Sequence, residues 1–370
     1  MRVVLSGGGT GGHIYPALAI AKQCAVEFPN TKFLYIGGQK GLESSIVPKE
    51  NIPFEAINIT GFRRKLSAEN LKTVVRFLRG VSTSKKLLKE FKPDVVVGTG
   101  GYVCGPVVYA AAKLGIPSII HEQNAVAGLT NRFLSKYAST VALSFEGMED
   151  AFPGAKNIIY TGNPRATTVY EADKTKGYTT LGLIPGTPIV LVVGGSRGAK
   201  AINDAMIEMA PYLHTLDQVR FVYVTGENYY EPTLKAIKAK TGNLPRGLQV
   251  LPYVHNMPEV LASTTLIVNR AGASFLAEIT SLGIPSILIP SPNVTNNHQE
   301  KNARTLEKAG AAEVILESAL TGETLFGAIQ KIMRDVAIQV SMSNASRRLG
   351  KPDSAQLLVE EMRRLMQKRR

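Results

Sequence analysis

The chain has 370 residues, of which 44% are hydrophobic and 19% charged, and its formal net charge at pH 7 is +14. This length suits two α/β domains, and no stretch approaches the roughly 18 consecutive apolar residues of a membrane-spanning helix. The N-terminus lacks the apolar segment of a signal peptide, and Cys24 and Cys104 lie too far apart for a CxxC metal motif. We therefore expect a cytoplasmic protein with an anionic partner: nucleic acid, a membrane surface or a phosphorylated substrate.

Short apolar strands and helical patterns alternate along the whole chain. In the first half we predict strands at 3–5, 33–36, 94–97, 118–121 and 140–144, with helices near 14–27 and 67–91. In the second half we predict strands at 189–193, 221–225, 249–253, 266–269, 286–290 and 313–316. Strands separated by helices form parallel sheets that are covered on both faces, so two such series indicate an α/β protein with two doubly wound domains.

The glycine–proline turn at 161–164 marks the expected domain boundary. It gives an N-terminal domain of residues 1–163 and a C-terminal domain of residues 164–350, and we expect the C-terminal helix at 351–370 to pack back on the first domain. Ligands of open parallel sheets lie at the carboxyl ends of the strands, so two such edges that face each other would form an interdomain cleft.

The glycine-rich loop at 7–12 follows the first predicted strand and precedes a helix, as in the G-x-G-x-x-G motif of dinucleotide-binding domains. That motif also predicts an acidic residue at the end of the second strand, but here the first carboxylate after that strand is Glu43. An NAD-binding role is therefore weakened, and the loop at 195–200 lacks the spacing of a Walker A motif. Both glycine loops could still hold phosphate or sugar hydroxyls through backbone N–H groups, or could simply be tight turns.

Two side chains near these loops could carry chemistry. His13 closes the first loop on the first turn of a predicted helix, where the helix N-terminus disfavours protonation, so it could be a neutral general base or a structural residue. Glu278 lies one turn into the helix after 269–274, where its carboxylate could accept two hydrogen bonds from a ribose diol or could simply be stabilised by the helix dipole. The polar loop at 290–300 contains groups typical of sugar-hydroxyl partners, although solvated loops share this composition.

These motifs form one ordered set over essentially the whole chain. The set comprises GGTGGH at 8–13, GGYVCGP at 100–106, HEQN at 121–124, AGLTN at 127–131, GNPR at 162–165, GGS at 194–196, NRAG at 269–272, Glu278 and HQ at 298–299. It closely resembles the MurG family, the transferases that add N-acetylglucosamine to lipid I in peptidoglycan synthesis. The resemblance implies a GT-B architecture of two facing Rossmann-like domains, with UDP-GlcNAc held mainly by the C-terminal domain and the lipid-linked acceptor by the N-terminal domain.

The resemblance also implies a role for individual residues. In the C-terminal domain, Glu278 would bind the ribose hydroxyls, Gly195 and Ser196 the diphosphate, the main chain of Val254 the uracil, and Ala273, Ser274 and Gln299 other parts of the donor. In the N-terminal domain, Thr10, Gly11, Gly12 and Asn124 would line the transfer site, with His13 as the favoured base and Glu122 as the second candidate. Arg165, an expected donor contact, follows Pro164 directly, whereas some relatives have an extra residue between them, and His298 stands where some relatives have a second glutamine.

The reaction implied is a direct inverting displacement. A base takes the proton of the muramyl 4-hydroxyl, which attacks the anomeric carbon as UDP leaves from the opposite face. Loop amides and a helix N-terminus would stabilise the charge on UDP, and the chain has no Asp-x-Asp signature, so we expect neither a metal nor another cofactor.

The segment 61–92 contains ten Lys/Arg and two Glu, a net charge of +8. Leu71, Val74, Val75 and Leu78 follow a helical i, i+3, i+4, i+7 stripe, which we assign to packing on the protein's own core. We predict that Phe62, Phe77 and Val81, surrounded by Lys72, Arg76 and Arg79, dock on an anionic membrane surface, which would place the protein peripherally on the cytoplasmic face of the cell membrane. Nucleic acid would explain the charge but not the two sugar-type loops.

Two other functions stay open at this point. A UDP-GlcNAc 2-epimerase would share the fold but would need no acceptor, and a nucleotide-sugar sensor would bind the donor without catalysis.

Overall fold

The computed structural model describes residues 1–61, 68–195 and 197–368, which form two compact units. The first unit comprises Met1–Thr167 together with Pro352–Arg370, and the second comprises Thr168–Lys351. The chain thus passes between units inside α6 (Arg165–Tyr170), a few residues after the turn at 161–164, and its C-terminal segment belongs to the first unit.

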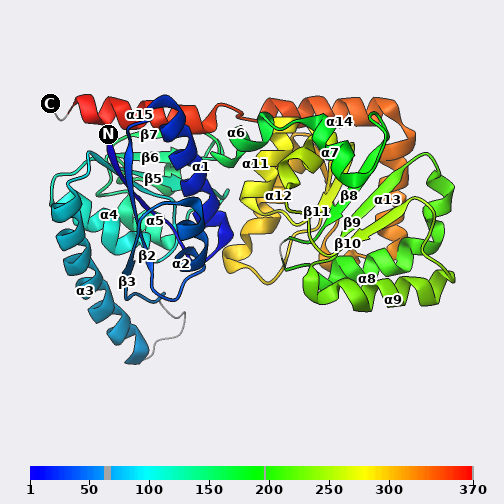
Figure 1. The fold of residues 1–370 in the computed structure, drawn as a ribbon, viewed down its shortest axis with the longest axis horizontal. Coiled ribbons are helices and arrows are strands. Elements are labelled where there is room, and N and C mark those ends of the chain that lie inside the picture. The colour runs from blue at the N-terminus through cyan, green and yellow to red at the C-terminus, as the bar shows by residue number, and fades with distance from the viewer. Residues whose placement is uncertain (62–67, 196, 369–370) are drawn as a thin grey trace. The chain divides into compact units, whose positions relative to one another are not determined.

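The first unit is built on a parallel sheet whose strand order, within the described residues, is β3-β2-β1-β4-β5-β6-β7 (Figure 1). Its strands are β1 (Arg2–Ser6), β2 (Lys32–Gly38), β3 (Phe54–Ile57), β4 (Val95–Gly98), β5 (Ser118–Glu122), β6 (Thr140–Leu143) and β7 (Ile158–Tyr160). Its helices are α1 (Gly11–Glu27), α2 (Glu43–Ile46), α3 (Ala68–Phe91), α4 (Cys104–Lys113), α5 (Leu129–Leu134) and α15 (Ser354–Gln367). The central strands β1 and β4 are runs of fully buried valine and leucine because helices cover both faces of the sheet.

The second unit repeats this arrangement with the strand order β10-β9-β8-β11-β12-β13 in its described part. Its strands are β8 (Ile189–Val193), β9 (Arg220–Val224), β10 (Leu248–Leu251), β11 (Leu266–Asn269), β12 (Ser286–Leu288) and β13 (Ala312–Val314). Its helices are α7 (Lys174–Leu181), α8 (Lys200–Met209), α9 (Tyr230–Thr241), α10 (Met257–Ser263), α11 (Ala273–Leu282), α12 (His298–Lys308), α13 (Gly322–Arg334) and α14 (Val336–Leu349). The predicted fold class, two doubly wound α/β units with parallel sheets, is confirmed.

The C-terminal helix α15 lies against α1 in the first unit, where Figure 1 shows the red helix beside the blue one. Leu358, Val359 and Met362 of α15 are almost completely buried in one cluster with Ile14 and Cys24 of α1. This apolar contact joins the last helix of the chain to the helix that begins at the first glycine loop.

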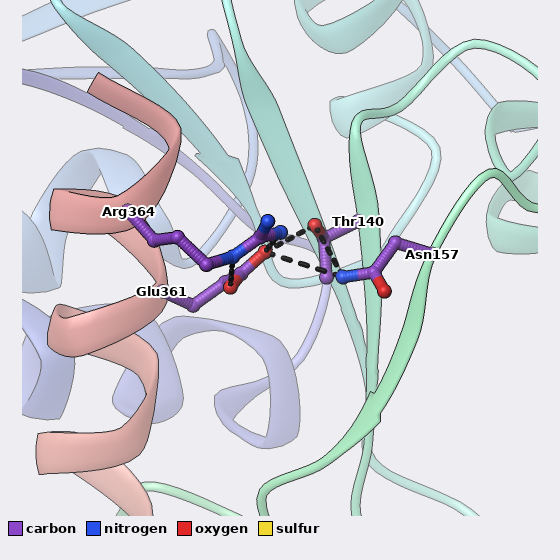
Figure 2. A network of polar contacts seen from close by, with 4 residues as sticks. All are labelled: Thr140, Asn157, Glu361 and Arg364. Carbon is purple, nitrogen blue, oxygen red and sulfur yellow. Dashed lines mark hydrogen bonds and ion pairs between the residues drawn. The ribbon is translucent and has the colours of Figure 1, made fainter. Parts of the chain in front are cut away.

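A polar network fixes the same helix to the sheet (Figure 2). The Glu361 carboxylate accepts hydrogen bonds from Thr140 at the start of β6, from Asn157 at 3.4 Å, and from Arg364 Nε and Nη2 at 2.6 Å each. Burial alone would raise the pKa of Glu361, but the hydrogen bonds from Arg364 and Thr140 lower it below its ordinary value. The charged form of Glu361 is therefore part of the folded first unit.

The two faces of helix α3 differ from the prediction about which residues are buried and which are exposed. Val81 is only 8% exposed and belongs to the core, and Phe77 is partly buried and stacks edge-on against Phe133. Three residues of the stripe assigned to the core instead face solvent: Val74 is 42%, Val75 43% and Leu78 61% exposed. Phe62 lies outside the described residues. In the described part of the chain, no helix is both long and apolar enough to span a membrane.

Candidate active site

The first glycine loop is held in place by hydrogen bonds within the protein. Gly8 N–H donates to Gly100 O at 3.2 Å, and Gly9 N–H donates to the carboxylate of Glu43 at 3.0 Å. Glu43 is fully buried, and its other oxygen accepts from Gly38 N–H at 2.9 Å. A Cβ on Gly8 would lie 2.3 Å from Glu43 Oε1, so the loop needs glycine at this position. Glu43 thus connects the end of β2 to the loop, a role that the sequence did not indicate.

Helix α1 begins directly after this loop without a side-chain cap. The N-cap residue Thr10 is extended, with φ −146° and ψ 157°, and its hydroxyl caps no backbone N–H group. The first turn contains Gly11 and Gly12 and no acidic residue. The first N–H groups of a helix have no partner within the helix, so this terminus is suited to a polar or anionic ligand.

His13 lies on the first turn of α1 with its ring anchored at one nitrogen. Its Nδ1 is 2.9 Å from Gly8 O, and a carbonyl oxygen only accepts, so Nδ1 carries the proton and donates. In the neutral ring, Nε2 therefore carries the lone pair. The side chain of Thr99 donates to the backbone oxygen of His13 at 2.6 Å and fixes the residue further. This arrangement presents a half-buried imidazole in the tautomer that a general base requires.

Glu122, the second candidate base, is engaged by its own loop. It ends β5, is 2% exposed, and accepts hydrogen bonds from Asn124 N–H at 3.1 Å and Gly128 N–H at 2.9 Å. The side-chain amides of Asn131 and Asn124 also donate to it, at 2.9 and 3.4 Å. A carboxylate with this many donors organises the 124–131 loop, so the geometry favours His13 over Glu122 as the base.

Arg165 starts α6 at the end of the first unit. Its backbone N–H donates to Asn163 Oδ1 at 3.1 Å, and its guanidinium lies 5.5 Å from the ring centroid of Tyr15, which is on α1. The structure therefore places Arg165 beside the helix that carries His13.

The second unit has its own glycine loop after β8. Gly195 has a φ of 95°, and Gly198 N–H donates to Gly195 O at 2.9 Å, which makes a tight turn before α8. A Cβ on Gly194 would lie 2.6 Å from the backbone nitrogen of Ala199, so this turn also depends on glycine. Ser196, the predicted diphosphate contact, lies outside the described residues.

Helix α11 begins close to several buried polar atoms. It starts at Ala273 with Gly272 as an N-cap that provides no side-chain hydrogen bond. The Ser274 hydroxyl and the Asn269 side-chain oxygen are buried, and within the described residues neither has a hydrogen-bond partner. Glu278, one turn later, is 4% exposed. Buried polar groups normally have partners, so the orphaned atoms indicate a ligand site at this terminus.

The two other predicted donor contacts lie in loops of the second unit. Val254 is 6% exposed and lies after β10, between Tyr253 and His255 in the sequence, and the rings of these two neighbours are in contact. The side-chain oxygen of Gln299, on the first turn of α12, accepts from Ser291 N–H at 2.9 Å, so its NH2 group is the part that can donate to a ligand. Among the residues that the structure describes, no group of three or more His, Cys, Asp or Glu side chains could hold a metal ion.

Comparison with known proteins assigns this architecture to a class. The model of the glycosyltransferase family 28 N-terminal domain matches residues 3–143, and that of the family 28 C-terminal domain matches residues 189–358. A Bacillus cereus protein, UDP-N-acetylglucosamine–N-acetylmuramyl-(pentapeptide) pyrophosphoryl-undecaprenol N-acetylglucosamine transferase 1, is 53% identical over the full length of both chains. The crystal structure of Acinetobacter baumannii MurG covers 98% of this chain and 99% of its own, at 30% identity and a TM-score of 0.77.

The fold is also shared more widely. A UDP-GlcNAc 2-epimerase from Neisseria meningitidis, solved with UDP-GlcNAc, covers 97% of this chain and 99% of its own with a TM-score of 0.68, but at 14% identity this likeness shows the fold alone. The matches to the two family models, together with the two Rossmann-like units, define a glycosyltransferase of the GT-B architecture. The chain belongs to glycosyltransferase family 28, and within it to the group that contains the Bacillus cereus transferase and MurG.

Proposed function

We propose that this chain is an inverting transferase that moves N-acetylglucosamine from UDP-GlcNAc to the 4-hydroxyl of the muramyl sugar of lipid I, with lipid II and UDP as products. The observation that carries this proposal is the full-length 53% identity with the Bacillus cereus protein, whose name specifies this sugar and a muramyl, undecaprenol-linked acceptor. The geometry of the first unit supports it, because an imidazole anchored through Nδ1 lies beside an uncapped helix N-terminus.

In the proposed mechanism, Nε2 of His13 takes the proton of the acceptor hydroxyl. The hydroxyl oxygen then attacks the anomeric carbon, and the bond from this carbon to UDP breaks with its electron pair leaving on UDP. The Gly8 carbonyl holds Nδ1–H, so the imidazole keeps its orientation while it gains the second proton. Thr10, Gly11, Gly12 and Asn124 would line this side of the reaction.

Donor binding is assigned to the second unit. Glu278 would accept from the ribose hydroxyls, the Val254 main chain would read the uracil, and Ala273 and Ser274 would meet the donor at the start of α11. Gln299 would donate to the sugar, Gly195 and Ser196 would hold the diphosphate, and Arg165 would contribute a cation. We propose that backbone N–H groups and helix N-termini stabilise the charge on UDP without a metal ion or other cofactor.

We further propose that the first unit docks peripherally on an anionic membrane, at the cytoplasmic face, where a lipid-linked acceptor would be found. The exposed apolar residues Val74, Val75 and Leu78 form the docking surface, and the exposed cations Lys72 and Arg79 flank it. Arg76 is better assigned to the protein itself, because its Nη1 donates to Thr60 Oγ1 at 3.0 Å. A basic, apolar helix face of this kind is typical of interfacial binding.

One assay tests the reaction. Purified protein is incubated with UDP-GlcNAc, and a lipid I analogue is added or withheld while UDP release and product mass are measured. Acceptor-dependent release is expected. Release or epimerisation of the donor without acceptor would favour the 2-epimerase, and binding of UDP-GlcNAc without turnover under either condition would favour a sensor; both results contradict the transferase proposal.

A vesicle assay tests the membrane surface separately. Replacement of Lys72 and Arg79 by Gln should weaken sedimentation with anionic vesicles about fivefold per residue, since each basic residue near such a surface contributes about 1 kcal/mol. Leu78→Glu should weaken it as well, whereas Ile184→Glu, at a residue of the second unit that is 79% exposed, serves as the matched control. Equal binding of Leu78→Glu and the control would remove α3 from the docking surface.

A further inference from the structure

A buried amide lies behind the first glycine loop, and the mechanism above does not use it. Gln123 follows β5 and is 2% exposed. Its Nε2 donates to the backbone oxygen of Thr99 and lies 3.0 Å from Nδ1 of His121. The Thr99 oxygen only accepts, so the amide nitrogen must face this way and the amide oxygen must point to the other side.

His121 fixes the same orientation from its far nitrogen. Its Nε2 is 2.8 Å from Gly162 O, which only accepts, so Nε2 carries the proton and Nδ1 accepts from Gln123. Burial lowers the pKa of His121 to about 4, so the ring is neutral near pH 7. The side chain of Gln123 therefore has one orientation over the physiological pH range.

The oxygen of Gln123 converges with the His13 ring on one point. A Cβ built on Gly100 would lie 2.7 Å from His13 Cδ2, 3.1 Å from His13 Nε2 and 3.4 Å from Gln123 Oε1. Gly100, at a φ of 106°, leaves this side of the backbone to the imidazole and the amide oxygen. Within the described residues Oε1 is buried without a hydrogen-bond partner, so its unused acceptor capacity needs an explanation.

We propose that Gln123 is a positioning residue for His13, whose protonated ring is stabilised by the dipole of the buried amide oxygen once His13 has taken a proton. The neutral ring holds its only proton on Nδ1, toward Gly8 O, and so offers this oxygen no donor. After proton transfer the ring is an imidazolium whose Nε2–H points to the acceptor, and the negative end of the Gln123 amide dipole, on the same side of Gly100 as the ring, stabilises the positive charge. Because Oε1 is buried, it acts through His13 and not on the acceptor. The acceptor hydroxyl as proton source rests on the proposed function, but the pairing of the two side chains does not.

Other ionisable groups lie on the elements around the first glycine loop: Glu43 on α2, Tyr35 on β2, Tyr102 before α4 and Cys104 at its start, His121 and Glu122 on β5, and Arg165 beside Tyr15 of α1. Burial raises the pKa of Tyr35 and of Tyr102, and that of Cys104 to about 12, so these three stay protonated near neutral pH. Glu43, Glu122 and Arg165 are retained in every variant below, so they do not distinguish those variants.

The test follows His13 directly by NMR. The chain has five histidines, so long-range 1H–15N spectra can resolve each imidazole over a pH titration. In Gln123→Met, the pKa of His13 should fall by about one unit, because an amide dipole that favours the protonated ring is lost. The acidic limb of the pH profile of kcat/KM should shift to lower pH together with the pKa of His13. Ser144→Ala is the control: it removes a 3.3 Å contact of His121 and keeps Gln123, so the His13 pKa should not change.

An unchanged His13 pKa in Gln123→Met would overturn the proposal. A second measurement needs no variant of Gln123: in the wild-type protein labelled with 13C-glutamine, the Gln123 side-chain carbonyl shift should titrate with the pKa of His13, and in His13→Phe it should not. A carbonyl shift that stays flat through the titration of His13 would also overturn it. If the pairing is observed but no sugar is transferred, the proposed function fails and the pairing stands.

Discussion

Glu361 offers a quantitative test of how the C-terminal helix is attached to the first unit. In Glu361→Gln, the side chain keeps its size but loses the charge that Arg364 pairs with at 2.6 Å. One of its two terminal atoms becomes an NH2 group, which cannot accept from Arg364 or Thr140. The network in Figure 2 would therefore lose an acceptor next to Thr140 at the buried start of β6.

The size of the effect follows from burial. Hydrogen bonds to charged groups contribute about 1.5–3 kcal/mol each when buried, but the Arg364 side chain is 40% exposed, so solvent screens its share. We expect a loss of about 1–3 kcal/mol in the free energy of unfolding, or about 3–10 °C in Tm for a domain of this size. Glu360→Gln, which makes the same change at the exposed neighbouring residue, should have almost no effect.

The pH dependence gives the sharper measurement. The folded pKa of Glu361 is lowered, so its contribution to stability is fully present above the ordinary pKa of glutamate, about 4.3, and is lost as pH falls through the folded pKa. The difference in unfolding free energy between wild type and Glu361→Gln should be constant from pH 6 to 7 and shrink below about pH 4.3. Circular dichroism melts and hydrogen exchange of α15 and β6 peptides measure it. A difference that does not change with pH would show that the carboxylate charge is not what holds the helix.

The proposed chemistry gives three further predictions. His13→Ala should lower kcat by about 10²–10⁴, the usual contribution of a general base, with little change in the affinity for UDP measured by calorimetry, and near-normal turnover would eliminate His13 as the base. Glu122→Gln should lower the Tm and increase hydrogen exchange in the 124–131 loop, because the carboxylate accepts hydrogen bonds from that loop. It should reduce kcat less than His13→Ala does. An equal or larger loss of kcat at unchanged Tm would restore Glu122 as a candidate base. Addition of EDTA should leave kcat unchanged if backbone N–H groups stabilise the leaving UDP, and a loss that Mg²⁺ restores would contradict a metal-independent site.

The central strands of both sheets could be predicted from sequence, but the edge strands of the first sheet could not. β1 and β4 are continuous apolar runs because both of their faces are buried. β3 and β7, by contrast, lie at the two edges, and Ile158–Tyr160 contains no fully buried residue. An edge strand is half exposed, so its sequence lacks the run that identifies the interior strands.

Helix α3 shows a second limit of sequence patterns. Periodicity identified which residues share a face, but it could not decide which face packs on the sheet. Phe77 and Val81 pack inward against α4 and its neighbours, while Val74, Val75 and Leu78 remain exposed. The predicted buried and exposed faces of α3 are the reverse of those observed, because both faces carry apolar residues and the sequence alone does not show which face has a packing partner.

Glu43 and Gln123 were missed as functional residues for a different reason. In the sequence, Glu43 serves only as evidence against NAD binding, and Gln123 is only one residue of the HEQN motif. Their contacts join residues far apart in the chain: Glu43 to Gly9, and Gln123 to Thr99. No local pattern marks such a residue, although the first carboxylate after β2 and the run of polar residues after β5 mark the segments to inspect.

These contacts also change how the first glycine loop should be understood. Three of its backbone groups are already used within the protein: Gly7 O by Tyr35, Gly8 N–H by Gly100 and Gly9 N–H by Glu43. A further backbone group, Gly8 O, orients the His13 ring. Because the N–H groups of Gly8 and Gly9 are engaged within the protein, they are not directed at a ligand, and we expect ligand contacts mainly from the start of α1. The glycines of the first loop therefore serve close packing and the tautomer of His13, and the resemblance to a dinucleotide motif reflects the strand–turn–helix geometry that both share.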